Sequence, residues 1–189
     1  MRQKLTNTIF ILIIVVSCWL ISFSFNDWFC ATMPRHQLLQ LPAMLFLGFF
    51  TGWQFLKKLK LEMHWGISLL IFVMASLIFW MLPHSIDAAV IDNRFNLLML
   101  INMFVAGLLT FPVLRNIIFE IRILFLGMVA VMSIATGIAL ISFNLLLCSA
   151  FNIEQQKETG AVLIKAGIAF FFFTLYVFFR GIGKHRSYE

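Results

Sequence analysis

Six apolar runs, each long enough to cross a lipid bilayer, constrain this chain more strongly than any other feature of its sequence. They lie at about residues 8–26, 38–56, 65–82, 96–114, 122–148 and 161–179. A transmembrane α-helix needs about 20 mostly apolar residues. Inside lipid every backbone group needs an internal partner, and the runs lack the alternation of barrel strands. We therefore predict an all-α fold, a polytopic bundle of six transmembrane helices.

The overall composition agrees with a chain that lives in a bilayer. It is 62% hydrophobic and only 12% charged, whereas about a quarter of the residues of a soluble domain are charged. No linker or large polar loop interrupts the runs, so we expect one integral membrane domain over residues 1–189. The basic residues form short clusters between the runs, which is typical of membrane topology. The lipid bilayer is the expected partner, and nucleic acid is not.

The distribution of basic residues predicts the orientation of the bundle. Ten of the fourteen lysine and arginine residues fall on one side if six helices alternate. By the positive-inside rule this side, with both termini, faces the cytoplasm. The first run is not followed by a small-residue cleavage site, so we expect it to be retained as a signal anchor. The loops at about 27–37, 83–95 and 149–160 then face the outside.

These outer loops collect residue types that bind metals. Two of the four histidines and two of the three cysteines lie there. His36, Gln40 and Met44 follow one another at four-residue steps, so they share one helix face. Histidine, cysteine and methionine together suit copper(I). The alternative is that each histidine forms hydrogen bonds near the lipid headgroups and each methionine fills a gap in the core.

His84 and Asp87 form a second candidate pair, three residues apart and just after Pro83. If Pro83 opens a short helix, the two side chains point the same way. Asp87 could then orient His84, as carboxylates orient metal-binding histidines. Alternatively, Asp87 stabilises the amide end of that helix.

Three further features have alternatives that the sequence leaves open. Cys30 and Cys148 would both face an oxidising compartment, where they could form a disulfide or share a metal. Lys165 either extends its ammonium group to the membrane surface or pairs with Asp87. Three glycines and one proline in the fourth and fifth runs are expected to permit close helix contacts or a kink: Gly107, Pro112, Gly127 and Gly137.

Several segments together resemble the CtaG-type cytochrome c oxidase assembly factors, which are polytopic proteins of bacterial inner membranes linked to copper insertion. The segments that carry the resemblance are Arg35–Pro42, Trp80–Pro83 with Asp87–Ala89, Ala106–Leu109 with Pro112–Leu114, and Gln155–Gln156 with Gly160 and Gly167. They cover roughly residues 35–167 in the family's order. The chain departs from the family's pattern at Met81, Asn96 and Asn102, where the family carries histidines.

The resemblance implies a protein that binds or delivers copper at its periplasmic face, with respiratory oxidase subunits as partners. We expect His36 and His84 to be ligands, Met33, Met44 and Cys148 to be further candidate ligands, and Asp87 to orient a histidine. The chain carries no enzyme signature such as Gly-x-Ser-x-Gly or His-Glu-x-x-His, so we predict that it is not an enzyme. Two alternatives are a metal-free structural or assembly subunit of a membrane complex and a small-solute transporter.

Overall fold

The computed structural model describes residues 2–142 and 148–186, and within these residues the chain is helical, with no strand. The predicted all-α class is confirmed. The elements are α1 (Arg2–Trp19), η1 (Leu20–Ser24), α2 (Asn26–Cys30), α3 (Met33–Arg35), η2 (His36–Gln40), α4 (Leu41–Phe55), α5 (Met63–Met81), α6 (Pro83–Ile91), α7 (Asn93–Asn116), α8 (Phe119–Ser142) and α9 (Ile153–Arg186). The segments η1 and η2 are single π-helical turns.

Six helices in the described part of the chain are long and apolar enough to span a membrane, as predicted. Most begin earlier than the apolar runs do. For example, α9 begins at Ile153, where the Asn152 side chain accepts a hydrogen bond from the Gln155 backbone at 2.8 Å. Hydropathy marks only the apolar part of a helix, whereas the helix itself continues through polar residues to its cap.

The predicted fifth helix, 122–148, is too long at its end. The described helix α8 ends at Ser142, and Cys148 is not helical. Residues 143–147 of this prediction lie outside the described residues. Cys148 extended the apolar run in the sequence, but in the structure it is a fully buried residue of a connecting segment. Apolarity alone cannot separate a buried connection from the end of a helix.

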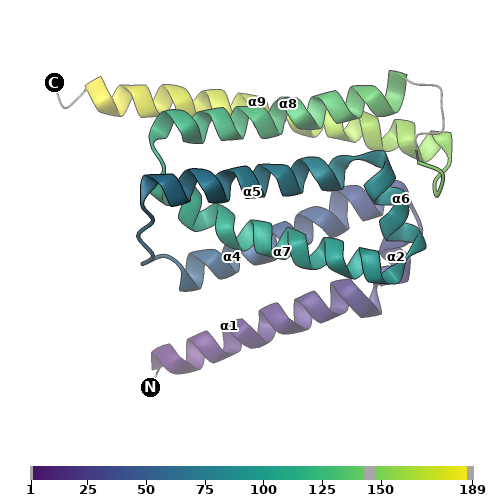
Figure 1. Cartoon of the computed structure of the whole chain (residues 1–189), viewed down its shortest axis with the longest axis horizontal. Coiled ribbons are helices and arrows are strands. Elements are labelled where there is room, and N and C mark those ends of the chain that lie inside the picture. Colours follow the sequence, from purple (N-terminus) through teal and green to yellow (C-terminus); the bar gives the residue numbers. More distant parts are fainter. Residues whose placement is uncertain (1, 143–147, 187–189) are drawn as a thin grey trace.

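The spans run side by side, with the two ends of the chain at one end of the bundle (Figure 1). The opposite end carries α2, α6 and residues 148–152, and we call it the cap end. The three predicted outer loops all begin at this end, as six alternating helices require. Which membrane face the cap end occupies stays a prediction.

Glycines set how closely the helices pack. The predicted close contact at Gly107 is confirmed, because a Cβ atom there would overlap the backbone carbonyl of Leu45 on α4. Gly48 and Gly52, one turn apart on α4, face the α7 backbone in the same way. Gly137 on α8 packs against Gly160 on α9, where a Cβ atom would lie 2.6 Å from the Gly160 carbonyl oxygen. Small residues let helix backbones approach in membranes, where the hydrophobic effect does not drive them together.

The close helix contact that was one of the two expectations for Gly127 is not formed. A Cβ atom at Gly127 would meet nothing within 4 Å, so this glycine does not mediate a helix contact. Pro112 lies inside α7 and is buried, and the kink expected there stays a prediction.

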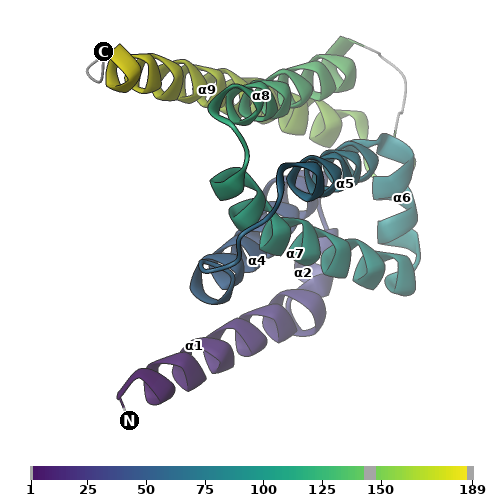
Figure 2. The same ribbon diagram turned by 60° about the vertical axis from the view of Figure 1, so that its left-hand side comes forward.

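The helices form three groups in space (Figure 2). The middle group of α4, α5 and α7 holds the main buried core, which includes Val73, Leu100 and Met103. The pair α8 and α9 packs along its length as a second group. Helix α1 lies to one side, and only 6% of its most apolar stretch is buried. A side-chain hydrogen bond of 3.0 Å from Gln54 to Asn7 joins α1 to α4.

Candidate functional site

A cluster of buried and half-buried polar side chains lies where η1, α2, η2 and α7 meet at the cap end. We call it the polar cluster, and its members are Asn26, Cys30, His36, Gln40 and Asn96. The Asn26 side-chain oxygen is its centre, because it accepts from Asn96 at 2.5 Å, from Gln40 at 3.1 Å and from Cys30 at 3.7 Å. Burial of polar groups is tolerated when they are paired in this way.

His36 is the member whose geometry points to chemistry. Its Nδ1 lies 2.7 Å from the Gln40 side-chain oxygen. The Gln40 amide nitrogen is committed to two oxygen acceptors, Asn26 Oδ1 and the Ile21 carbonyl. The amide oxygen therefore faces His36, and Nδ1 must carry the proton that it donates. The other ring nitrogen, Nε2, therefore carries a lone pair and no proton. It is buried and has no hydrogen-bond partner.

The local sequence explains why His36 takes this position. His36 to Gln40 form a π-helical turn that runs directly into α4, with the Leu41 amide bonded to the His36 carbonyl. Pro42 lacks an N–H and its ring crowds the carbonyl four residues earlier. A wider turn before Pro42 relieves that crowding. Such π-helical turns within α-helices occur frequently at functional sites.

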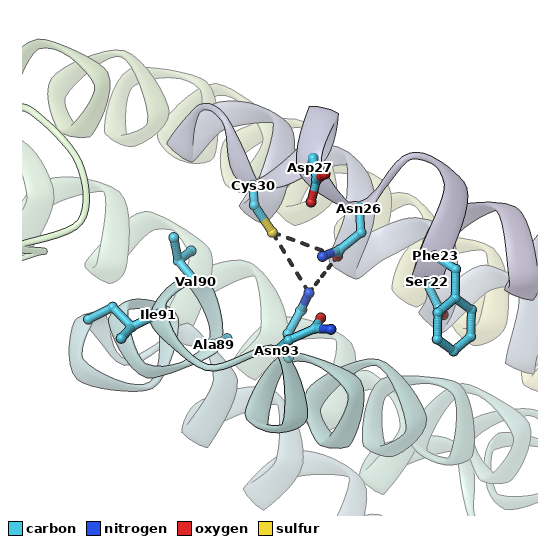
Figure 3. A pocket seen from close by; sticks show the side chains of 10 residues that line it. Ser22, Phe23, Asn26, Asp27, Cys30, Ala89, Val90, Ile91 and Asn93 are labelled. Carbon is cyan, nitrogen blue, oxygen red and sulfur yellow. Dashed lines mark hydrogen bonds between the residues drawn. The ribbon is translucent and has the colours of Figure 1, made fainter.

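An open pocket of about 330 Å³ borders the polar cluster (Figure 3). Its lining comes from the end of the first span, α2, α6 and the start of α7, and it consists of Ser22, Phe23, Asn26, Asp27, Cys30, Ala89, Val90, Ile91, Asn93 and Asn96. Figure 3 shows the Cys30 sulfur directed toward the Asn26 amide. Cys30 also lies 3.8 Å from His36 Nδ1, so it is the link between the pocket and the buried histidine.

The two cysteines at the cap end are protonated thiols. Burial, together with the nearby Asp27 carboxylate, raises the pKa of Cys30 to about 11. Burial and then Asp87 raise the pKa of Cys148 to about 12. Both cysteines are free, so the predicted disulfide alternative is not formed. Cys30 contacts Asn26 and His36, whereas Cys148 contacts the Pro83 carbonyl oxygen at 3.7 Å.

The six residues predicted to form a metal site are divided among four places. His36 is in the polar cluster. Met33 and Cys148 are both fully buried and belong to one apolar cluster. Met44 lies in the main core with α5 and α7 residues. His84 and Asp87 line a separate pocket of about 380 Å³ with Asp92 and Ser149.

Asp87 does not have either of its predicted roles. Both of its oxygens accept hydrogen bonds from the segment after α8: the Ser149 amide at 2.6 Å, the Ser149 hydroxyl at 3.0 Å and the Ala150 amide at 3.1 Å. The exposed His84 makes no hydrogen bond with it among the described contacts. Asp87 thus anchors the α8–α9 connection to α6. Its oxygens could not have been assigned to that connection from sequence spacing alone.

Two neighbouring predictions are also resolved. Pro83 opens the short helix α6, as expected, but the carboxylate that caps a helix start here is Asp92, which accepts from the Arg94 amide at 2.8 Å. Lys165 is exposed and forms no ion pair with Asp87 within the described residues. The alternative in which the Lys165 ammonium group extends toward the membrane surface stays a prediction.

Sequence analysis missed Asn26 and the role of Asn96. Each is an amide side chain beside or within an apolar run, and buried amides in a membrane need partners. That signal could have grouped Asn26 and Asn96 with Gln40 as amides that need partners. It could not have shown which of these residues pairs with which. Within the described residues, no group of three His, Cys, Asp or Glu side chains lies close enough together to hold a metal ion. Methionine and amide side chains are not counted in that statement.

Comparison with known proteins finds no family model, no curated protein and no solved structure that matches this chain.

Proposed function

We propose that this multi-pass membrane protein binds copper(I) as cargo at the cap end, with His36 as the central ligand, and supplies it to a respiratory oxidase during assembly. The observation that carries the proposal is the state of His36. Its Nδ1 proton is held by Gln40 while the lone pair of Nε2 is buried without a partner. Metal-binding histidines are typically oriented by a hydrogen bond from their other ring nitrogen in this manner.

The neighbourhood of His36 supports a soft metal ion. Met33 precedes His36 by three residues, a spacing that places two side chains on one helix face. Met33 shares its buried cluster with the Cys148 thiol. Thioether, thiolate and imidazole groups are ligands that copper(I) accepts, and a cysteine releases its proton when it binds the ion. His84, Asp87 and Met44 have no part in this proposal, because they lie in other parts of the structure.

The polar pocket beside Cys30 offers a route to the site. Asp27 and Cys30 line it, and Cys30 contacts His36. A carboxylate at the surface attracts a cation. Cys30 can then receive the ion as a thiolate, with its proton released to solvent through the open pocket. With the cap end facing the periplasm of a bacterial inner membrane, the ion would be taken from the outside. The resemblance to CtaG-type assembly factors suggests the recipient, a subunit of a respiratory oxidase.

The experiment that tests this function is copper(I) binding by the purified protein in detergent, measured by competition with a chromophoric copper(I) chelator. We expect about one copper(I) per chain, lost in His36→Ala and weakened in Met33→Leu, which keeps the apolar volume. His84→Ala and His64→Ala are matched controls, because both histidines are exposed. Circular dichroism of each variant verifies that the helices are intact.

The absence of copper(I) binding by the wild-type protein would overturn the proposal. So would equal losses in His36→Ala and His84→Ala. Either result favours a metal-free structural or assembly subunit. One feature supports that second candidate: few residues of the first span are fully buried in the bundle, so its exposed apolar face is available to a partner helix.

A further inference from the structure

A third cavity, of about 120 Å³, lies between α8 and the middle group of helices. We call it the methionine cavity. Its walls are almost wholly apolar, and the residues used below are Gln37 on η2, Trp80 and Met81 on α5, Met103 on α7 and Met132 on α8. It lies within the membrane-spanning helices and shares no lining residue with the polar pocket beside Cys30.

Gln37 is the feature of this cavity that needs an explanation. Its side chain is buried, with 4% exposed, and neither its amide oxygen nor its amide nitrogen has a hydrogen-bond partner. The Trp80 indole, which also lines the cavity, already donates to Asn102 at 2.9 Å. An unpartnered buried polar group costs about 1–3 kcal/mol. Gln37 therefore carries an unpaired donor and an unpaired acceptor, side by side, on a side chain that lines an apolar space.

Water is a poor occupant for this space. A buried water typically needs two to four polar partners, and empty apolar cavities stay dry. Only the Gln37 amide and the committed Trp80 indole are polar among the lining residues. A better match is a molecule with an apolar body, because the methionine side chains are flexible and adapt to irregular apolar shapes.

The two free atoms of Gln37 specify the polar end of such a molecule. A primary amide forms two parallel hydrogen bonds with a group that carries an acceptor and a donor on the same carbon. A neutral carboxyl group and a carboxamide group both have this arrangement, whereas an ester has only acceptors. A charged carboxylate would lack the donor and would be costly to bury at this depth.

We propose that the methionine cavity binds a lipid-soluble molecule that ends in a neutral carboxyl or carboxamide group, held by two parallel hydrogen bonds to Gln37. The volume, close to the roughly 150 Å³ cavity that holds benzene, accommodates the polar end and the first few carbons. The rest of the apolar chain lies among the helices or in the bilayer. This site is independent of the copper(I) site.

The test uses three probes with the same ten-carbon chain, added to the full-length protein in lipid nanodiscs: decanamide, decanoic acid and methyl decanoate. The readout is the nuclear magnetic resonance signal of isotope-labelled methionine methyl groups. We expect saturable shifts at Met81, Met103 and Met132, with Met33 as an internal control because it belongs to another buried cluster. Decanamide should bind at least tenfold more tightly than methyl decanoate, because two hydrogen bonds are worth more than 1.4 kcal/mol.

Two further arms separate the carboxyl from the amide and test Gln37 itself. Decanoic acid should bind only at pH values where it is protonated, while decanamide binding should not change with pH. In Gln37→Leu, decanamide and methyl decanoate should bind with equal affinity. Equal affinities in the wild-type protein, an unchanged preference in Gln37→Leu, or no saturable shift at the three methionines would each overturn the proposal.

Discussion

His36 and Gln37 are consecutive residues, and both are buried, yet they belong to two regions that differ in how far their polar groups are paired. In the polar cluster His36 lacks a partner only at Nε2, whereas both amide atoms of Gln37 lack one. His36 is in the polar cluster, where side chains from α2, η2 and α7 share hydrogen bonds around Asn26. Gln37 is in the methionine cavity, where its amide has no partner. The comparison teaches that burial alone does not make a polar residue structural. What matters is whether other elements bring partners to it.

The largest effect should come from removal of the centre of the polar cluster. Asn26→Leu leaves the Asn96 and Gln40 amide nitrogens with only weaker partners, at 3.7 Å and 3.3 Å. We expect a loss of about 2–4 kcal/mol in the free energy of unfolding, because each stranded buried donor costs about 1–3 kcal/mol. Reversible unfolding in mixed detergent micelles, followed by circular dichroism, measures it.

The control for Asn26→Leu is Asn93→Leu. Asn93 lines the same pocket but is exposed. Exposed substitutions usually change stability by no more than about 0.5 kcal/mol. Equal losses in the two variants would contradict the polar cluster as a stabilising network.

The contact between α4 and α7 supports both regions, and Gly107 is its most sensitive point. Gly107→Ala should lower the free energy of unfolding by about 1–3 kcal/mol, because the new methyl group overlaps the Leu45 carbonyl and forces the backbones apart. Gly127→Ala is the matched control. It meets no atom within 4 Å, and alanine favours helix over glycine by up to about 1 kcal/mol. The two substitutions should therefore have opposite signs.

Gln37→Leu should stabilise the ligand-free protein, unlike any substitution in the polar cluster. The change removes two unpartnered polar atoms and keeps a similar apolar volume. We expect a gain of about 1–2 kcal/mol, measured by the same unfolding assay after extensive exchange of bound lipid. Gln40→Leu makes the corresponding change in the polar cluster and should destabilise instead. A loss of stability in Gln37→Leu would mean that the amide has a structural role.

The smallest effect concerns the reactivity of Cys30 at the edge of the polar cluster. With a pKa of about 11, its thiolate is a minor species at pH 8. Its alkylation should be about tenfold slower than that of an ordinary thiol, after allowance for the higher nucleophilicity of a more basic thiolate. The rate should rise as pH rises toward 11, because deprotonation produces the reactive form.

The alkylation rate is measured by mass spectrometry of the Cys30 peptide over a pH series. Asp27→Asn is the informative variant, since it removes the negative charge that helps to raise the Cys30 pKa. It should speed alkylation at pH 8. A rate that reaches its plateau near pH 9 would show that the thiol is not perturbed.

Much of the fold could be predicted from the sequence because a bilayer allows few solutions. An apolar run of sufficient length must be a helix, so the number of spans and their alternation follow directly. The helix ends were harder. Hydropathy does not detect caps such as Asn152 and Asp92, and it extended the fifth run to the buried, non-helical Cys148.

The candidate site was predictable only in part. The four-residue step from His36 to Gln40 correctly placed the two on one face, where they now form a hydrogen bond. The same step did not bring His84 to His36, and Asp87 proved to anchor the Ser149 backbone. Those outcomes depend on which helices pack together, and no spacing within one helix contains that information.

The sequence by itself determined that this protein folds in a lipid bilayer, and therefore that its fold is all-α. Six long apolar runs require six helices in lipid. The tertiary structure alone decided which polar residues have partners. Glycine contacts bring α4 against α7, Asn96 is thereby placed beside Asn26, and Gln37 faces the methionine cavity. The physical reason is that hydrophobicity is a property of each segment, whereas a hydrogen bond between distant residues exists only once their helices have packed.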